Sequence, residues 1–72
     1  MSRRRLVFEK TARTLYVADR LGYRYEVDYR RGLSSWRAVV YVPGGSELLG
    51  ISDTLDGAQK LAQSHQEVVS AL

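Results

Sequence analysis

The 72-residue sequence contains no cysteine, one histidine, one proline and one tryptophan. Without cysteine, the chain has no disulfide and no thiolate that could act as nucleophile or metal ligand. One histidine and scattered carboxylates give no recognisable metal-ligand spacing, so we expect no metal and no cofactor. No apolar run approaches the ~20 residues that cross a membrane as a helix, and we expect no membrane partner. A small domain without these aids depends on its core or on oligomerisation.

The beginning of the chain lacks the apolar segment of a secretory signal. Only three apolar residues separate the basic start "MSRRR" from Glu9, whereas signal peptides carry an apolar stretch of about 7–15 residues. We therefore expect a cytoplasmic protein with a single domain spanning residues 1–72. Within it we expect a basic arm over 1–5, antiparallel strands within 6–52 and a helix over 54–71.

Alternation of polar and apolar residues predicts two long strands in the middle of the chain. Residues 23–29 alternate tyrosine and valine with charged residues, and residues 36–42 follow after a stretch of turn formers. One register joins their apolar faces and also sets opposite charges side by side, whereas a slip of one residue would oppose charged and apolar rows. The predicted pairs are Tyr29 with Trp36, Val27 with Ala38, Tyr25 with Val40 and Asp28 with Arg37.

The flanking segments predict further strands. Pro43 and two glycines form a turn before a short strand over 47–52, in which Gly50 indicates a bulge or a close backbone approach. In the N-terminal third, "RLVFE" and "TLYVAD" are typical of strands. A helix over 10–21 is the alternative, although the β-branched residues of this segment favour strands.

The C-terminal segment predicts an amphipathic helix. Asp53 or Thr54 can cap its N-terminus, and Asp56 suits the first turn. Apolar positions recur at spacings of three and four, with His65 on the same stripe as a satisfied, partly buried side chain. The expected apolar stripe is Leu55, Ala58, Leu61, Ala62, Val68, Val69 and Leu72, and the expected polar face is Gln59, Lys60, Gln63, Ser64, Gln66 and Glu67.

Together these patterns predict an α+β fold, in which an antiparallel sheet of three to five strands packs on one C-terminal helix. Small alanines on the stripe would let the helix lie close to the sheet, with Trp36 and the tyrosine row filling the space between them. The expected core comprises Tyr25, Val27, Trp36, Ala38, Val40, Leu55, Ala58, Leu61, Ala62 and Val68.

No motif indicates an enzyme. The serines at 34, 35 and 46 lie in predicted turns, where serine is expected for backbone hydrogen bonding. Glu26 and Asp28 share a strand face, but the arginines around them indicate a solvated, ion-paired surface. The turn "VPGGSE" lacks the lysine and the strand–helix setting of a phosphate loop.

Charge is distributed unevenly and favours a nucleic-acid partner. Residues 1–31 hold nine basic and four acidic residues, and nine of the eleven basic residues in the chain are arginine. Arginine suits phosphate and base contacts, although codon bias in a GC-rich genome would also enrich it. We expect DNA or RNA to bind the basic arm and the sheet face opposite the helix. The candidate nucleic-acid-binding residues are Arg3, Arg4, Arg5, Arg13, Arg24, Arg37 and Tyr41.

A protein partner is the alternative. Val39 and Tyr41 on the outer sheet face could form a small apolar patch, and aromatic and arginine residues are typical of binding hot spots. The sheet edge could also pair with another strand, so both a monomer and a homodimer stay open.

The order of elements resembles a known DNA-binding architecture. Trp36 and Ala38 in one strand, Gly50 in the next, and Thr54 and Ala58 at the start of the helix resemble the AP2 domain and the arm-binding domains of tyrosine integrases. The resemblance covers about 23–65 and implies a three-stranded sheet on one helix, with DNA contacts from the exposed sheet face. The matching positions there are Arg24, Arg37 and Tyr41, whereas Glu26 and Asp28 depart from the basic pattern.

The whole chain also resembles small arginine-rich proteins encoded by actinobacterial phages. That resemblance is compositional. It implies a phage accessory protein that works in the cytoplasm of the host cell and binds a host protein through its sheet face or edge.

Overall fold

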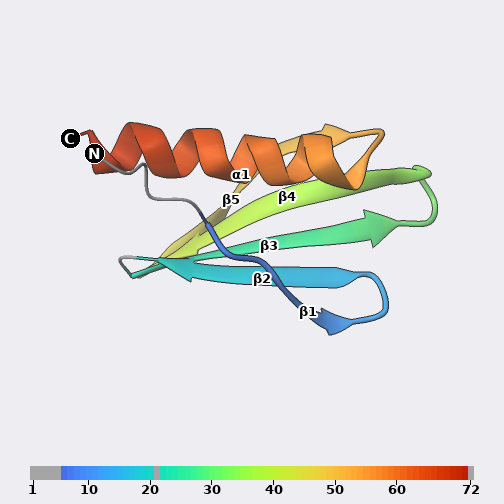
Figure 1. The fold of residues 1–72 in the computed structure, drawn as a ribbon, viewed down its shortest axis with the longest axis horizontal. Helices are drawn as coiled ribbons and strands as arrows, with labels where there is room; N and C mark the ends of the chain where they lie inside the picture. Colours follow the sequence, from blue (N-terminus) through green and yellow to red (C-terminus); the bar gives the residue numbers. More distant parts are fainter. Residues whose placement is uncertain (1–5, 21, 72) are drawn as a thin grey trace.

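The fold is a single antiparallel sheet with one helix, as the sequence predicts. The computed structural model describes residues 6–20 and 22–71. Neighbouring strands in the sheet are also consecutive in the chain, so that the sheet is a five-stranded meander (Figure 1). In chain order, the elements are β1 (Glu9–Ala12), β2 (Leu15–Arg20), β3 (Tyr23–Arg30), β4 (Ser35–Val42), β5 (Gly45–Ser52) and α1 (Leu55–Ser70).

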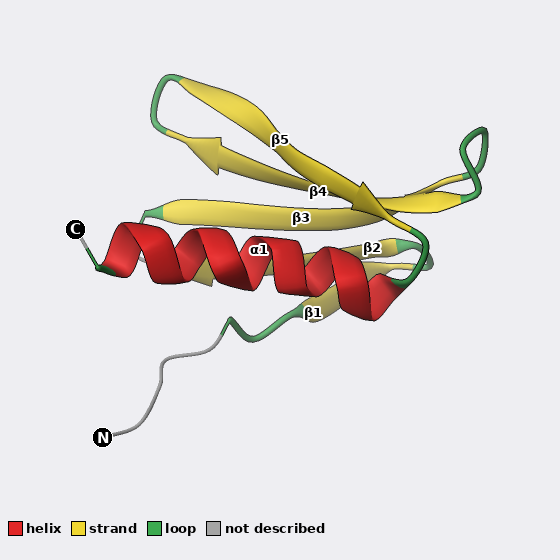
Figure 2. Ribbon diagram, turned by 90° about the horizontal axis from the view of Figure 1, so that it is seen from above, coloured by secondary structure: helices red, strands yellow, loops and turns green. Residues whose placement is uncertain are grey.

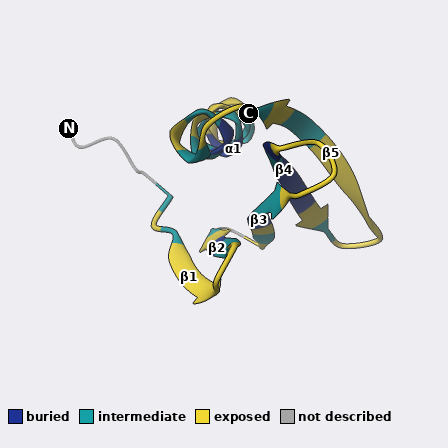
Figure 3. Ribbon diagram, turned by 90° about the vertical axis from the view of Figure 1, so that its right-hand side faces the viewer, coloured by how far each residue is buried: buried dark blue, intermediate teal, exposed yellow. Residues whose placement is uncertain are grey.

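The sheet has two different faces. Helix α1 packs on one of them, the inner face, against β3, β4 and β5 (Figure 3). No helix covers the opposite, outer face in the part of the chain described. Toward its turn, the β4–β5 hairpin diverges from the helix, so that the first half of β5 is exposed (Figure 2).

The register between β3 and β4 is the predicted one. All four predicted pairs are present, including Asp28 with Arg37. Because one row of this pairing is apolar and faces α1 while the β3 residues of the other row are all charged, sequence alternation was sufficient to determine it.

The core is built mainly from small side chains. Four of the nine buried apolar residues are alanines, which allows the close approach of helix and sheet that the sequence predicts. Trp36, Leu55 and Leu61 are only partly buried against this core. The buried apolar residues are Val17, Ala18, Tyr25, Val27, Ala38, Val39, Val40, Ala58 and Ala62.

The helix is rotated relative to the predicted apolar stripe. Val68, expected in the core, is 63% exposed, whereas Gln66, expected on the polar face, is 1% exposed. The reason is that Gln66 continues the i, i+4 line of Ala58 and Ala62 and is satisfied there by hydrogen bonds, while Val68 points away from that line. At the N-terminus the cap is Thr54, whose Oγ1 accepts from Gly57 N–H at 3.0 Å.

The N-terminal third forms strands, so the alternative helix over 10–21 is wrong. The strand prediction for "RLVFE" is also wrong in detail, because pairing begins only at Glu9. Leu6 instead donates its backbone N–H to Gln63 Oε1 at 2.8 Å, and Leu6 and Phe8 pack against the core. Contact with the helix therefore replaces strand pairing in this segment.

Gly50 has both properties that the sequence indicated. The β4–β5 register shifts between Ala38 and Val39, which marks a bulge opposite them at Leu49–Gly50. Gly50 has φ +155°, and a Cβ there would lie 2.9 Å from Leu61 Cδ1. A side chain at this position would therefore meet both backbone strain and a steric clash.

Candidate binding surface

The outer face of strands β3, β4 and β5 divides into two halves of different character. The charged half consists of Arg24, Glu26, Asp28 and Arg30 on β3, together with Arg37 on β4. The apolar half consists of Val39 and Tyr41 on β4 and of Leu48 and Ile51 on β5. Arg24, Arg37 and Tyr41 therefore lie on the face opposite the helix, where the sequence placed them.

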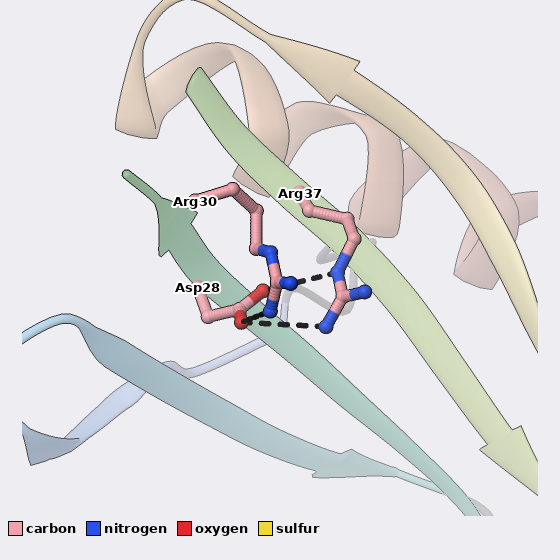
Figure 4. A network of polar contacts seen from close by, with 3 residues as sticks. All are labelled: Asp28, Arg30 and Arg37. Carbon is pink, nitrogen blue, oxygen red and sulfur yellow. Dashed lines mark hydrogen bonds and ion pairs between the residues drawn. The ribbon is translucent and has the colours of Figure 1, made fainter. Parts of the chain in front are cut away.

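The central feature of the charged half is a carboxylate held by two arginines. Arg37 Nε and Nη2 donate to Asp28 Oδ1 and Oδ2, each at 3.3 Å, and Arg30 Nη1 lies 3.6 Å from Asp28 Oδ2 (Figure 4). The bidentate Arg37–Asp28 contact fixes the guanidinium plane in the surface. Arg37 is thus already engaged with an anion of its own chain.

Arg24 also lies among carboxylates. Its Nε is 3.9 Å from both Asp19 Oδ1 and Glu26 Oε2. These contacts are long and exposed, so each contributes little stability. They nevertheless lower the local positive potential that a phosphate would meet at this position.

The formal net charge of the chain is confined to residues 1–5. Residues 6–72 contain eight basic and eight acidic residues, so that the formal net charge of +3 is equal to the charge of Arg3, Arg4 and Arg5 alone. Those three arginines lie outside the described residues. Within the five strands, five basic and five acidic residues balance, and the asymmetry that remains in residues 6–72 comes from Arg13 and Arg31 in turns and from the acidic residues of the C-terminal segment.

Three of the four side chains of the apolar half are exposed. Tyr41, Leu48 and Ile51 are 39%, 56% and 48% exposed. Val39 lies opposite Leu48 and is buried, while Ile51 lies opposite Arg37. Three large apolar side chains are thus exposed together beside a partly exposed arginine.

Sequence reasoning identified only the β4 members of this surface. Leu48 and Ile51 are three positions apart, and strict strand alternation would place them on opposite faces. The bulge at Leu49–Gly50 adds one residue to β5 and returns Ile51 to the outer face. Gly50 was the sequence signal for that bulge, but its effect on the facing of Ile51 was not inferred.

Arg13 is separate from the other candidates. It lies exposed in the turn between β1 and β2. That turn leads into the Leu15–Asp28 pair, whereas Arg24 pairs with Asp19 toward the other end of β2. The described candidates therefore do not form one continuous basic site.

The inner face contains a polar cluster between the sheet and the helix. The Tyr25 hydroxyl donates to Gln66 Oε1 at 3.2 Å and shares a 2.8 Å hydrogen bond with His65 Nδ1. The predicted role of His65 as a satisfied, partly buried side chain is confirmed. Burial raises the pKa of Tyr25 above its ordinary value of 10.0, and neighbouring Tyr23 adds to the shift.

A shallow groove of about 170 Å³ runs between the N-terminal segment and α1. Leu6 and Phe8 line one side, and Lys60, which pairs with Asp56 at 3.2 Å, lines the other. Within residues 6–20 and 22–71, no three histidine or acidic side chains cluster closely enough to hold a metal ion.

Comparison with known proteins does not identify a family for this chain. The chain matches no protein family, no curated protein and no solved structure. Helix α1 is too short and too polar to cross a membrane, and the described residues contain no other helix.

Proposed function

We propose that this chain is a small non-catalytic protein-binding module that contacts its partner through the apolar half of the outer face. The observation that carries the proposal is the joint exposure of Tyr41, Leu48 and Ile51 on one uncovered sheet surface. Single exposed apolar residues are ordinary, but adjacent ones mark binding surfaces. Tyrosine and arginine at their border are the side chains that hot spots favour.

The charges of the same face support a protein partner over a nucleic acid. A phosphate backbone requires cations that are free to replace its counterions. Here Arg37 and Arg30 contact Asp28, and Arg24 lies between two carboxylates. Binding a phosphate at this face would compete with contacts that the arginines already make.

Differential capture tests the proposal. The wild type, a patch variant (Leu48→Ser with Ile51→Ser) and a matched control (Leu33→Ser with Val68→Ser) are used as baits in a nuclease-treated cell lysate. The control residues are 58% and 63% exposed, but lie in a turn and on the helix. We expect a protein that the wild type and the control capture equally and the patch variant does not. If all three baits capture the same proteins, the apolar half is not the binding surface.

A second candidate function, nucleic-acid binding through the arm, has one observation in its favour. The net positive charge resides in Arg3, Arg4 and Arg5, whereas the rest of the chain is neutral. If the arm carries the phosphate contacts, replacing its three arginines by serine should reduce the salt slope of binding by about three. The double variant Arg24→Ala, Arg37→Ala should leave that slope nearly unchanged. Mobility shifts with duplex and single-stranded probes over a salt series measure both, and absence of any shift at low salt would eliminate this candidate.

A further inference from the structure

We infer that the free edge of β5 binds an extended segment of a partner protein as an added strand, with a lysine or arginine of that segment opposite Glu47. The inference rests on the proposed function and specifies the chemistry of the partner. Strand addition draws its affinity from main-chain hydrogen bonds and its selectivity from side chains at alternate positions.

The backbone of the edge is available for such bonds. β5 is the last strand of the sheet, and its Gly45 pairs with Val42 across a two-residue turn. In a hairpin of this kind the pair next to the turn is hydrogen-bonded. The following pairs are then alternately non-hydrogen-bonded and hydrogen-bonded. Ser46 and Leu48 therefore direct their N–H and C=O groups away from β4.

The two edges of the sheet differ in protection. β1 has only four residues, includes Lys10, and has its own register shift. These are devices by which proteins prevent edge pairing. β5 has eight residues with no lysine, arginine or proline. Its bulge lies in the second half and leaves Gly45–Leu48 regular and exposed on both faces.

The side chains of this edge specify the added strand. On the outer face, Leu48 and Ile51 would extend their apolar surface onto apolar residues of the new strand. On the other face, Glu47 lies opposite Val40, is exposed, and forms no ion pair with any residue that the structure describes. Opposite charges on neighbouring strands stabilise their pairing, so Glu47 favours lysine or arginine.

A second copy of the chain fits the same edge less well. In an antiparallel pair, the side chains of two opposed residues lie on the same face of the sheet. If two copies pair symmetrically, one residue of the strand must therefore lie opposite its own copy, and the two-fold axis passes at that residue. An axis at Glu47 opposes two carboxylates, which is unfavourable. If the axis passes through Ser46, regular pairing ends at the turn residue Gly44, two residues away. If it passes through Leu48, pairing ends as soon at the bulge. Each self-pairing is therefore repulsive or very short.

The experiment uses random dodecapeptides displayed on phage, selected on the full chain, followed by fluorescence anisotropy with one enriched peptide. We expect the enriched sequences to carry a lysine or arginine flanked by apolar or β-branched residues. Ser46→Pro removes an outward N–H without removing a bond to β4, and should weaken binding about tenfold. Glu47→Lys should weaken it by a similar factor and restore binding to a peptide with glutamate in place of the basic residue. Leu33→Ser, the control, should change the affinity less than about twofold.

Other results would overturn the inference. Failure to enrich any peptide, or binding that is indifferent to both Ser46→Pro and Glu47→Lys, would exclude strand addition at β5. A wild-type dimer in sedimentation equilibrium that Ser46→Pro dissociates would assign the edge to a second copy. If Leu48→Ser abolishes binding of the enriched peptide while Ser46→Pro and Glu47→Lys do not, the proposed function stands without strand addition.

Discussion

At the scale of single residues, Tyr25 links the sheet to the helix through a polar contact in the core. Its hydroxyl lies between His65 and Gln66, which are neighbours on α1. Because the hydroxyl has one proton, donation to Gln66 leaves His65 to donate from Nδ1. The Gln66 amide in turn donates to Ser70 Oγ at 2.6 Å. A chain of satisfied polar groups thus permits glutamine and tyrosine side chains in a dry position.

Replacing Tyr25 by phenylalanine should destabilise the domain by about 1–3 kcal/mol, because polar atoms of His65 and Gln66 would lose their partner in a buried site. Urea denaturation measures the free energy of unfolding. Tyr41→Phe is the matched control, since Tyr41 is exposed and should lose little. Equal losses in the two variants would show that the hydroxyl contacts contribute no stability.

The raised pKa of Tyr25 predicts a loss of stability at alkaline pH. Above pH 10, the unfolded chain releases this proton before the folded chain does, so the unfolded state gains free energy of ionisation that the folded state does not. The contribution is complete below the unfolded pKa and is lost as pH rises through the folded pKa. Between about pH 9 and 11, the wild type should lose more unfolding free energy than Tyr25→Phe. Parallel pH profiles would contradict the assignment.

At the scale of elements, the bulge in β5 has two consequences. It places Gly50 against Leu61 of the helix and directs Ile51 to the outer face. The same extra residue thus brings strand and helix into close contact on one face and enlarges the apolar half on the other. The shape of the candidate surface depends on this one irregularity.

Replacing Gly50 by alanine should cost about 1–3 kcal/mol, because an L side chain at φ +155° is strained and its Cβ meets Leu61. Gly45→Ala is the matched control in the same strand, because an added Cβ would have no atom within 4 Å there and φ is not in the left-handed region. Thermal melting compares the two variants. A Gly50→Ala variant as stable as Gly45→Ala would mean that the bulge relaxes freely.

At the scale of the whole molecule, a small core is closed by aromatic side chains at its margin. Trp36 is only partly buried, but its ring lies 6.1 Å from that of Tyr16 and 5.3 Å from that of Tyr29. It also packs against the buried cluster formed by Val27, Ala38 and Ala58. Because the buried residues are mostly alanine and valine, this margin supplies much of the apolar area that folding removes from water.

Trp36→Ala should therefore destabilise the domain by about 3 kcal/mol, a large part of the stability of so small a domain. Thermal melting and near-ultraviolet circular dichroism follow the loss. Leu33→Ala, an exposed truncation in the β3–β4 turn, should leave the melting temperature nearly unchanged. A Trp36→Ala variant that melts like the control would refute the view that the aromatic margin closes the core.

The sequence alone determined the antiparallel order of β3, β4 and β5, the register of β3 with β4, and the capped C-terminal helix, whereas it left a helix over 10–21 open as an alternative to the first strands. These features depend on alternation, turn residues and capping, all of which act between near neighbours in the chain. It also placed Arg24, Arg37 and Tyr41 on the outer face, because alternation fixes the facing of a regular strand.

Tertiary structure decided what local patterns could not determine. The rotation of α1, which buries Gln66 and exposes Val68, depends on a partner tyrosine on a distant strand. The bulge that exposes Ile51 beside Leu48 depends on how β5 fits against both β4 and the helix. The ion pairs of the outer-face arginines depend on which carboxylates the sheet places next to them. Each is a property of contacts between elements, and periodicity within one element carries no information about them.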